Sequence, residues 1–221
     1  MAARILFDQE LELLKNQVTE MSERAEISYD RLVYAVKKGE RNVLEQLLDN
    51  DRQMTDMQRS IEGKCLTLLT RQQPVARDMR LVSAALKVVT DIERIGDHVT
   101  DIAELYLRMD KIAVDGEYEV LLVQMMEEAK NMLHEAVEAF VDASEEAAGE
   151  VIAHDDMVDD MFNRIKEKLM EAIREHTLDA DKVVDYLMIA KYLEKIGDHA
   201  VNIGEWAIFQ KTGDIRGVKL Y

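Results

Sequence analysis

Residues 93–98 read Glu-Arg-Ile-Gly-Asp-His, and residues 194–199, which begin 101 positions later, read Glu-Lys-Ile-Gly-Asp-His. A second correspondence supports this repeat, because residues 51–57 match residues 155–161 at an offset of 104, with Asp, Asp and Met at equivalent positions. The offset changes across residues 72–74, in a turn before a helix, where a change in length is tolerated. The chain is therefore predicted to be a duplication of two homologous units, residues 4–113 and 114–212, with a tail at 213–221.

The composition favours an all-α fold, because the chain has one Pro, nine Gly and 5% aromatic residues while strong helix formers are abundant. Apolar residues recur at the spacing of one helix face. We expect six long helices, packed as two tandem three-helix bundles. Their expected ranges are 4–38, 42–71, 75–114, 117–142, 145–176 and 182–210, with breaks at Gly39 and Pro74 and an N-cap at Ser144.

The charge and the cysteine content restrict the partners and the compartment. A net charge of −17 argues against binding to nucleic acid or to an anionic membrane, since both require clustered Lys and Arg. Cys65 is the single cysteine and can form no internal disulfide. No apolar segment has the length of a signal peptide core or a membrane span. We expect a cytoplasmic protein whose acidic surface suits cations or basic partners.

The repeated phrase places acidic side chains on one helix face, because positions four apart lie about one turn above each other. Two sets share a face in this way: Glu93, Asp97 and Asp101 in the first unit, and Glu194, Asp198 and Asn202 in the second. Like charges at this spacing repel by a few tenths of a kcal/mol, and a glycine inside a helix costs about 1 kcal/mol relative to Ala. Both penalties occur twice, which indicates a compensating cation or basic partner, and a close approach at Gly96 and Gly197.

The second helix of each unit adds carboxylates to these faces: Asp51 in the first unit, and Asp155 and Asp159 in the second. Ligand sets made only of oxygen favour magnesium, calcium or manganese, or iron when several carboxylates bridge. The first unit has Thr55 at the position of Asp159, and the second has Asn202 at the position of Asp101. The sequence therefore predicts two unequal metal sites for divalent or iron-type ions.

Solvated acidic faces are the alternative to metal sites. Arg94 and Lys195 lie three residues before Asp97 and Asp198, so local ion pairs can offset much of the repulsion. His98 points about 100° away from the neighbouring aspartate on a helix and is interpreted, like its counterpart His199, as a packing residue. The chain contains no Glu-x-x-His pair, phosphate-binding glycine loop, His-Glu-x-x-His or Gly-x-Ser-x-Gly motif. We therefore predict neither catalysis nor an organic cofactor.

The two Glu-x-x-x-Asp turns, together with the segment Arg-Gln-Gln-Pro-Val-Ala-Arg-Asp-Met-Arg at residues 71–80, closely resemble the PhoU family of bacterial phosphate-uptake regulators. The resemblance extends over about residues 7–209, and its most specific element is the Arg-Gln-Gln-Pro segment. It implies two three-helix units and a cytoplasmic protein, peripheral to the membrane, that represses phosphate-starvation signalling when phosphate is plentiful.

The resemblance also implies partners and ligands. In that family the partners are the phosphate ABC transporter, particularly its ATPase subunit, and a sensor histidine kinase, and members are commonly homodimers. Metal clusters bind some members through the Glu-x-x-x-Asp turns, which assigns Glu93, Asp97, Glu194 and Asp198 as ligands, assisted by Asp51, Asp155 and Asp159. Two other functions stay open: a metal store or metal-dependent enzyme using the carboxylates, and a purely structural helical scaffold. The acidic face can also dock a basic partner.

Overall fold

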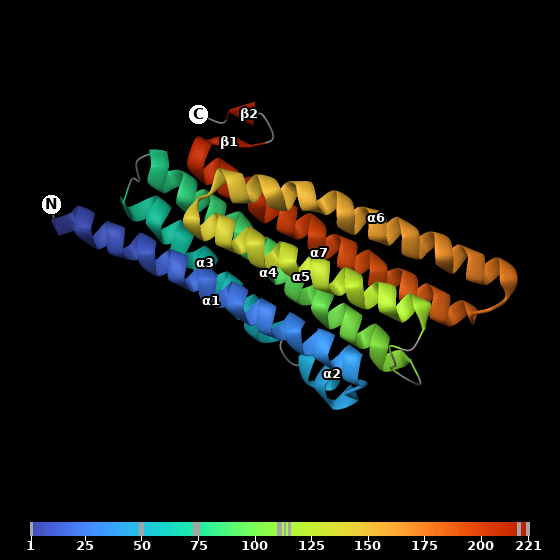
Figure 1. Cartoon of the computed structure of the whole chain (residues 1–221). Coiled ribbons are helices and arrows are strands. Elements are labelled where there is room, and N and C mark those ends of the chain that lie inside the picture. The colour runs from blue at the N-terminus through green and yellow to red at the C-terminus, as the bar shows by residue number, and fades with distance from the viewer. Residues whose placement is uncertain are drawn as a thin grey trace.

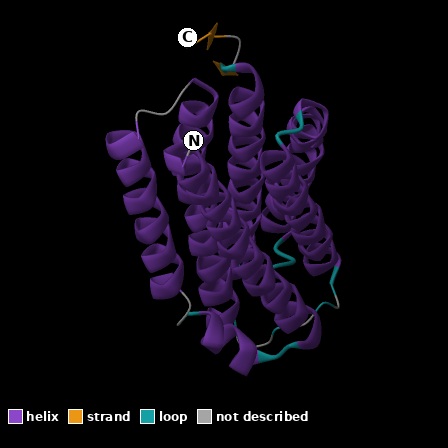
Figure 2. Cartoon of the chain, turned by 90° about the vertical axis from the view of Figure 1, so that its left-hand side faces the viewer, coloured by secondary structure: helices purple, strands orange, loops and turns teal. Residues whose placement is uncertain are grey.

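The computed structural model describes residues 2–48, 51–72, 76–109, 112, 114, 116–215 and 218–219; within these ranges, the side chains at 2–4, 51, 52, 71, 72, 215, 218 and 219 are not described. The described residues include six long helices: α1 (Ala2–Lys38), α3 (Asp51–Gln72), α4 (Ala76–Arg108), α5 (Glu117–Asp142), α6 (Glu145–Glu175) and α7 (Ala180–Thr212). They lie side by side along a common direction (Figure 1 and Figure 2). The all-α fold with three long helices per unit is confirmed.

Local sequence signals account for most of the helix ends. Gly39 follows α1 with φ of +70°, a conformation that costs glycine little. Ser144 caps α6, since its hydroxyl accepts a hydrogen bond from the backbone N–H of Ala147 at 3.2 Å. Asp179 caps α7 through the N–H of Asp181 at 2.9 Å. Gly213, with φ of +79°, ends α7. The predicted N-cap at Ser144 and the break at Gly39 are therefore confirmed.

The expected second helix at 42–71 was wrong in one respect, because it is divided into the short helix α2 (Arg41–Leu47) and α3. Leu44 and Leu47 of α2 are buried. The helical spacing of apolar residues continues through α2, so this spacing does not mark the end of the helix. Residues 49 and 50, between the two helices, lie outside the described residues.

Two other expectations differ from the structure. The third helix, expected to extend to residue 114, ends at Arg108. The expected polar tail includes two short antiparallel strands, β1 (Asp214–Ile215) and β2 (Val218–Lys219), with Ile215 paired to Val218. Residues 73–75, which include part of the Arg-Gln-Gln-Pro segment, lie outside the described residues.

The two units pack against each other along their third helices. Within the first unit α1, α3 and α4 contact one another, and in the second α5, α6 and α7 do so. α4 and α7 then pack together across the units, and α1 packs on α5. The core is aliphatic, with Leu14, Ile92 and Ile196 among its fully buried residues. The Glu-x-x-x-Asp turns therefore lie in the middle of α4 and α7, the two helices at the junction of the units. No helix in the described part of the chain is long and apolar enough to cross a membrane.

Candidate carboxylate sites

The second unit brings together four carboxylates that the sequence singled out: Asp155 and Asp159 on α6, and Glu194 and Asp198 on α7. Asp155 packs on α7 at Gly197, where a Cβ atom would lie 3.1 Å from Asp155 Oδ1. This Oδ1 atom is buried and has no hydrogen-bond partner among the described residues. The expected close approach at Gly197 is thus made by the candidate ligand itself.

The surroundings of Asp155 and Asp159 disfavour the ionised form of these two carboxyl groups on α6. Burial, followed by the charges of Asp159, Asp198 and Glu194, raises the pKa of Asp155 from 3.8 to about 6. Burial and the charges of Glu194 and Asp198 also raise the pKa of Asp159, although Lys191 opposes this shift. Burial is the first cause of both shifts and the neighbouring carboxylates add to it, so the ionised forms of Asp155 and Asp159 are disfavoured.

Two lysines on α7 supply part of the missing positive charge. Lys191 Nζ donates to Glu194 Oε1 at 2.6 Å, and Lys195 Nζ pairs with Asp198 and lies 3.3 Å from Glu194 Oε2. The hydrogen bond to Asp198 is the largest cause of a raised pKa at Lys195. The local ion pairs expected from the sequence are therefore present, but they are directed at the α7 carboxylates rather than at Asp155.

The first unit lacks an equivalent concentration of charge. Thr55 Oγ1 donates to Glu93 Oε1 at 3.4 Å, in the position where the second unit has a carboxylate. Arg94 binds Asp97 at 3.0 Å and lies 3.8 Å from Glu93. At Gly96 a Cβ atom would meet Met54 at 3.6 Å, an ordinary contact. Asp51 begins α3, but its side chain lies outside the described residues. The two sites are thus unequal in the described residues.

Two predicted site residues point elsewhere. Asp101 Oδ2 lies 3.4 Å from Nδ1 of His98. Asn202 Nδ2 donates to Asp91 Oδ1, on α4, at 3.2 Å. The same Asp91 oxygen lies 2.8 Å from Nδ1 of His199. Asp101 and Asn202 therefore make these contacts near the junction where α4 packs on α7.

This junction is a polar cluster that the sequence did not reveal. His98 stacks on Tyr192 with ring centroids 5.3 Å apart, and lies 5.6 Å from the ring of His199. Burial lowers the pKa of His98, although its hydrogen bond with Asp101 opposes the shift. The interpretation of both histidines as packing residues fits these contacts. The sequence does contain one signal for the cluster, because Asp91 of α4 aligns with Tyr192 of α7 at the repeat offset of 101. This difference between the repeats can be interpreted only once α4 is known to pack on α7.

The oxygen-only donor set of Asp155, Asp159, Glu194 and Asp198 fits a hard cation in its chemistry. The present arrangement is not a closed ligand set, because no three His, Cys, Asp or Glu side chains within the described residues are close enough to hold a metal ion. A bound cation would therefore compete with Lys191 and Lys195 for Glu194 and Asp198.

Comparison with protein families gives a match to the PhoU domain at residues 18–106 and again at 122–207. A protein of Clostridium acetobutylicum named phosphate-specific transport system accessory protein PhoU homolog is 34% identical over 95% of this chain and 96% of its own length. A Thermotoga maritima protein named PhoU homolog 1 of the same system is 31% identical over 99% of this chain and 97% of its own.

Solved structures give the same result for the fold. The crystal structure of PhoU from Pseudomonas aeruginosa is 28% identical, covers 94% of this chain and 100% of its own, and has a TM-score of 0.87. That of the phosphate transport system regulatory protein PhoU from Streptococcus pneumoniae is 23% identical, covers 96% of this chain and 100% of its own, and has a TM-score of 0.88.

Proposed function

The chain belongs to the PhoU family, and we propose that it is an accessory protein of a phosphate-specific transport system. In this role it restrains phosphate uptake and represses phosphate-starvation signalling when phosphate is plentiful. The observation that carries the proposal is the match of both units to the PhoU domain, together with relatives of that name that align over nearly their full length.

The proposed mechanism is that of an adaptor. A cytoplasmic homodimer binds the ATPase subunit of the phosphate ABC transporter on one side and a sensor histidine kinase on the other, and it reaches the membrane only through these partners. The net charge of −17 supports basic partner surfaces, since complementary charge speeds and orients encounter. Apolar side chains on the outside of α6 and α7, including Ile173 at 49% and Val184 at 58% exposure, offer the uncharged contact area that interface centres use.

The test is complementation in a strain that lacks its own gene for this protein, with a phosphatase reporter of the starvation response. We expect the wild-type chain to repress the reporter at high phosphate, and affinity-tagged chain to retain both the ATPase subunit and the kinase. Replacing Val184 by Asp should weaken retention, whereas replacing the exposed Asp160 by Asn serves as a matched surface control on α6. Retention of neither partner at any phosphate concentration would refute the adaptor mechanism.

Metal binding is a second candidate function, and the state of Asp155 favours it. Its Oδ1 is buried without a hydrogen-bond partner in the described residues, and its pKa is raised to about 6. Asp155 and Asp159 would hold the ion from α6, and Glu194 and Asp198 from α7. A divalent or iron-type cation would supply the positive charge that this cluster lacks.

Elemental analysis of protein purified without chelator tests this candidate. We expect metal in the wild type, retained in Asp160→Asn and lost when Asp97 and Asp198 are both replaced by Ala. Protein that is free of metal, combined with repression by the double variant that equals the wild type, would exclude a metal mechanism and leave the same acidic face for a basic partner.

A further inference from the structure

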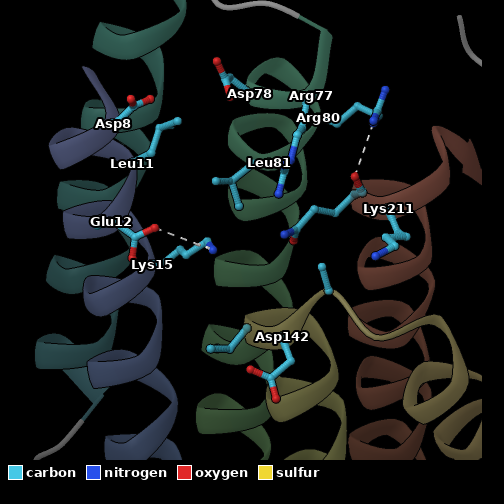
Figure 3. A pocket seen from close by; sticks show the side chains of 13 residues that line it. Asp8, Leu11, Glu12, Lys15, Arg77, Asp78, Arg80, Leu81, Asp142 and Lys211 are labelled. Carbon is cyan, nitrogen blue, oxygen red and sulfur yellow. Dashed lines mark hydrogen bonds and ion pairs between the residues drawn. The ribbon is translucent and has the colours of Figure 1, made fainter. Parts of the chain in front are cut away.

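A cavity of about 660 Å³ lies at the end of the bundle where the two units meet, away from the carboxylate cluster. Four elements line it: the start of α1, the first turns of α4, the junction of α5 and α6, and the end of α7. Figure 3 shows Asp8 and Glu12 on α1, Arg77 and Arg80 on α4, and Lys211 on α7 around the opening. Its size is that of a small-molecule site rather than of a single bound ion.

One wall of the cavity carries Arg77, Arg80 and Lys211, although the buried Asp78 of α4 also lines it and the chain as a whole is acidic. Arg80 Nε donates to the carbonyl oxygen of Gln210 at 3.2 Å, which satisfies a carbonyl in the last turn of α7. Arg77 and Lys211 are exposed, and neither forms an ion pair with any carboxylate of the described side chains. Arg77 and Lys211 therefore line the cavity without a described ion pair, whereas Arg80 is held by its hydrogen bond to α7.

The floor contains an unsatisfied polar group. Gln210 is 8% exposed and lines the cavity, and its Oε1 atom is buried with no hydrogen-bond partner among the residues described. A buried acceptor without a donor is costly for the protein. A ligand that brings a hydroxyl or amine to this atom removes that cost.

The internal repeat shows that these groups are not required by the fold. At the repeat offset of 101, Arg77 and Arg80 correspond to Leu178 and Asp181, and Gln210 corresponds to Met109. The corresponding region of the other unit thus has an apolar or an oppositely charged residue at each of these positions. The opposite wall of the cavity carries the carboxylates of Glu12 and Asp142, which suit hydroxyl groups of a ligand, and Lys15 lies 3.9 Å from Glu12 there.

We propose that this cavity binds a small, hydroxyl-bearing phosphate ester. Its phosphate lies between Arg77 and Lys211, since guanidinium and ammonium groups bind phosphate through charge-assisted hydrogen bonds. One hydroxyl donates to Gln210 Oε1, and others donate to the carboxylates of Glu12 and Asp142. Inorganic phosphate satisfies the basic wall alone and leaves most of the cavity and the acidic wall unused. The site goes beyond the adaptor role and does not depend on it.

The experiment is isothermal titration calorimetry of the full chain in EDTA with ribose 5-phosphate, inorganic phosphate and ribose. We expect ribose 5-phosphate to bind at least tenfold more tightly than inorganic phosphate, and ribose to give no measurable binding. Replacing Arg77 and Lys211 by Ala should weaken ribose 5-phosphate at least tenfold, because two charge-assisted contacts are lost. Gln210→Leu should remove the advantage of the ester over inorganic phosphate.

Lys87→Ala is the matched control, because it removes an exposed positive charge from α4 about 15 Å along the helix from Arg77. The Lys87→Ala variant should bind ribose 5-phosphate with the same affinity as the wild type. The Arg77 and Lys211 substitutions are at exposed positions, so circular dichroism and thermal melting should show an intact fold even if Gln210→Leu disturbs α7. Absence of binding, binding that the double variant retains, or equal affinity for inorganic phosphate would each overturn the proposal. None of these results depends on partner binding, so they leave the adaptor role to its own test.

Discussion

Replacing Asp155 by Asn should stabilise the metal-free protein at neutral pH. The folded state raises the pKa of this carboxyl from 3.8 to about 6, so the folded chain holds the proton more tightly than the unfolded chain does. The contribution of this carboxyl to stability is therefore fully present below about pH 4 and is lost as the pH rises through about 6. At pH 7 the ionised carboxylate opposes folding, and the uncharged amide of Asn does not.

The magnitude follows from the same shift. A rise from 3.8 to about 6 corresponds to about 3 kcal/mol at about 1.4 kcal/mol per pH unit. Because the carboxyl is partly open to solvent, screening reduces this figure, and we expect a gain of about 1 to 1.5 kcal/mol. Asn retains the size of the side chain, so its packing against Gly197 should change little.

The assay is urea unfolding in EDTA at pH 7.5 and at pH 4, followed by circular dichroism. Asp155→Asn should unfold at higher urea than the wild type at pH 7.5, and most of this difference should vanish at pH 4, where the wild-type carboxyl is protonated when folded. Asp160→Asn, an exposed aspartate on the same helix, controls for the change in net charge. A gain that is independent of pH, or a loss of stability at pH 7.5, would refute the electrostatic account of the cluster.

Three substitutions and one labelling reaction probe other parts of the molecule. Gly96→Ala should raise the free energy of unfolding by about 0.5 to 1 kcal/mol, because the new Cβ atom would lie 3.6 Å from Met54, an ordinary contact. Gly197→Ala should raise it less, because the new Cβ atom would lie 3.1 Å from Asp155 Oδ1. Equal gains for the two variants in urea unfolding would contradict this difference. Asp91→Ala should cost about 1 to 3 kcal/mol in the same assay, because it removes the acceptor of Asn202 and the partner of His199, and a neutral result would show that the junction cluster contributes nothing. Burial raises the pKa of Cys65 to about 12, so a thiol reagent at pH 8 should label it only after urea is added; rapid labelling of the native protein would place Cys65 at the surface.

The sequence predicted the long helices well, because helix formation depends on local spacing. Apolar periodicity gave the long helices, and the i, i+4 rule placed Glu194 and Asp198 on one face. The end of α2 was missed because Leu44 and Leu47 continue the apolar spacing up to the break. The polar cluster at the junction, in contrast, depends on contacts between distant segments. Asp91, for example, reaches His199 from 108 positions away, and no local pattern marks such a pair.

The junction between the units explains why a duplicated helix did not stay identical. Where α4 packs on α7, the equivalent histidines come together, with ring centroids 5.6 Å apart. Each histidine then contacts the residue that lies two positions before the repeated phrase on the other helix: Tyr192 for His98 and Asp91 for His199. A second aspartate in place of Tyr192 would add another partly buried charge to the junction, whereas the tyrosine adds none. Asp91, which is half-buried, is contacted by His199 and Asn202.

The same reasoning applies to the two carboxylate sites. Asn202 is the partner that Asp91 requires across the junction, so the loss of an acidic residue at this position of the second unit is explained by packing rather than by a weakened cation site. In the first unit the equivalent Asp101 contacts His98 on its own helix. The difference between the two units that affects cation binding therefore lies on α3 and α6. The first unit has the uncharged Thr55 where the second unit has the carboxyl group of Asp159. A cation should accordingly bind first between α6 and α7, and Thr55→Asp is the single change that brings the first unit toward the same affinity.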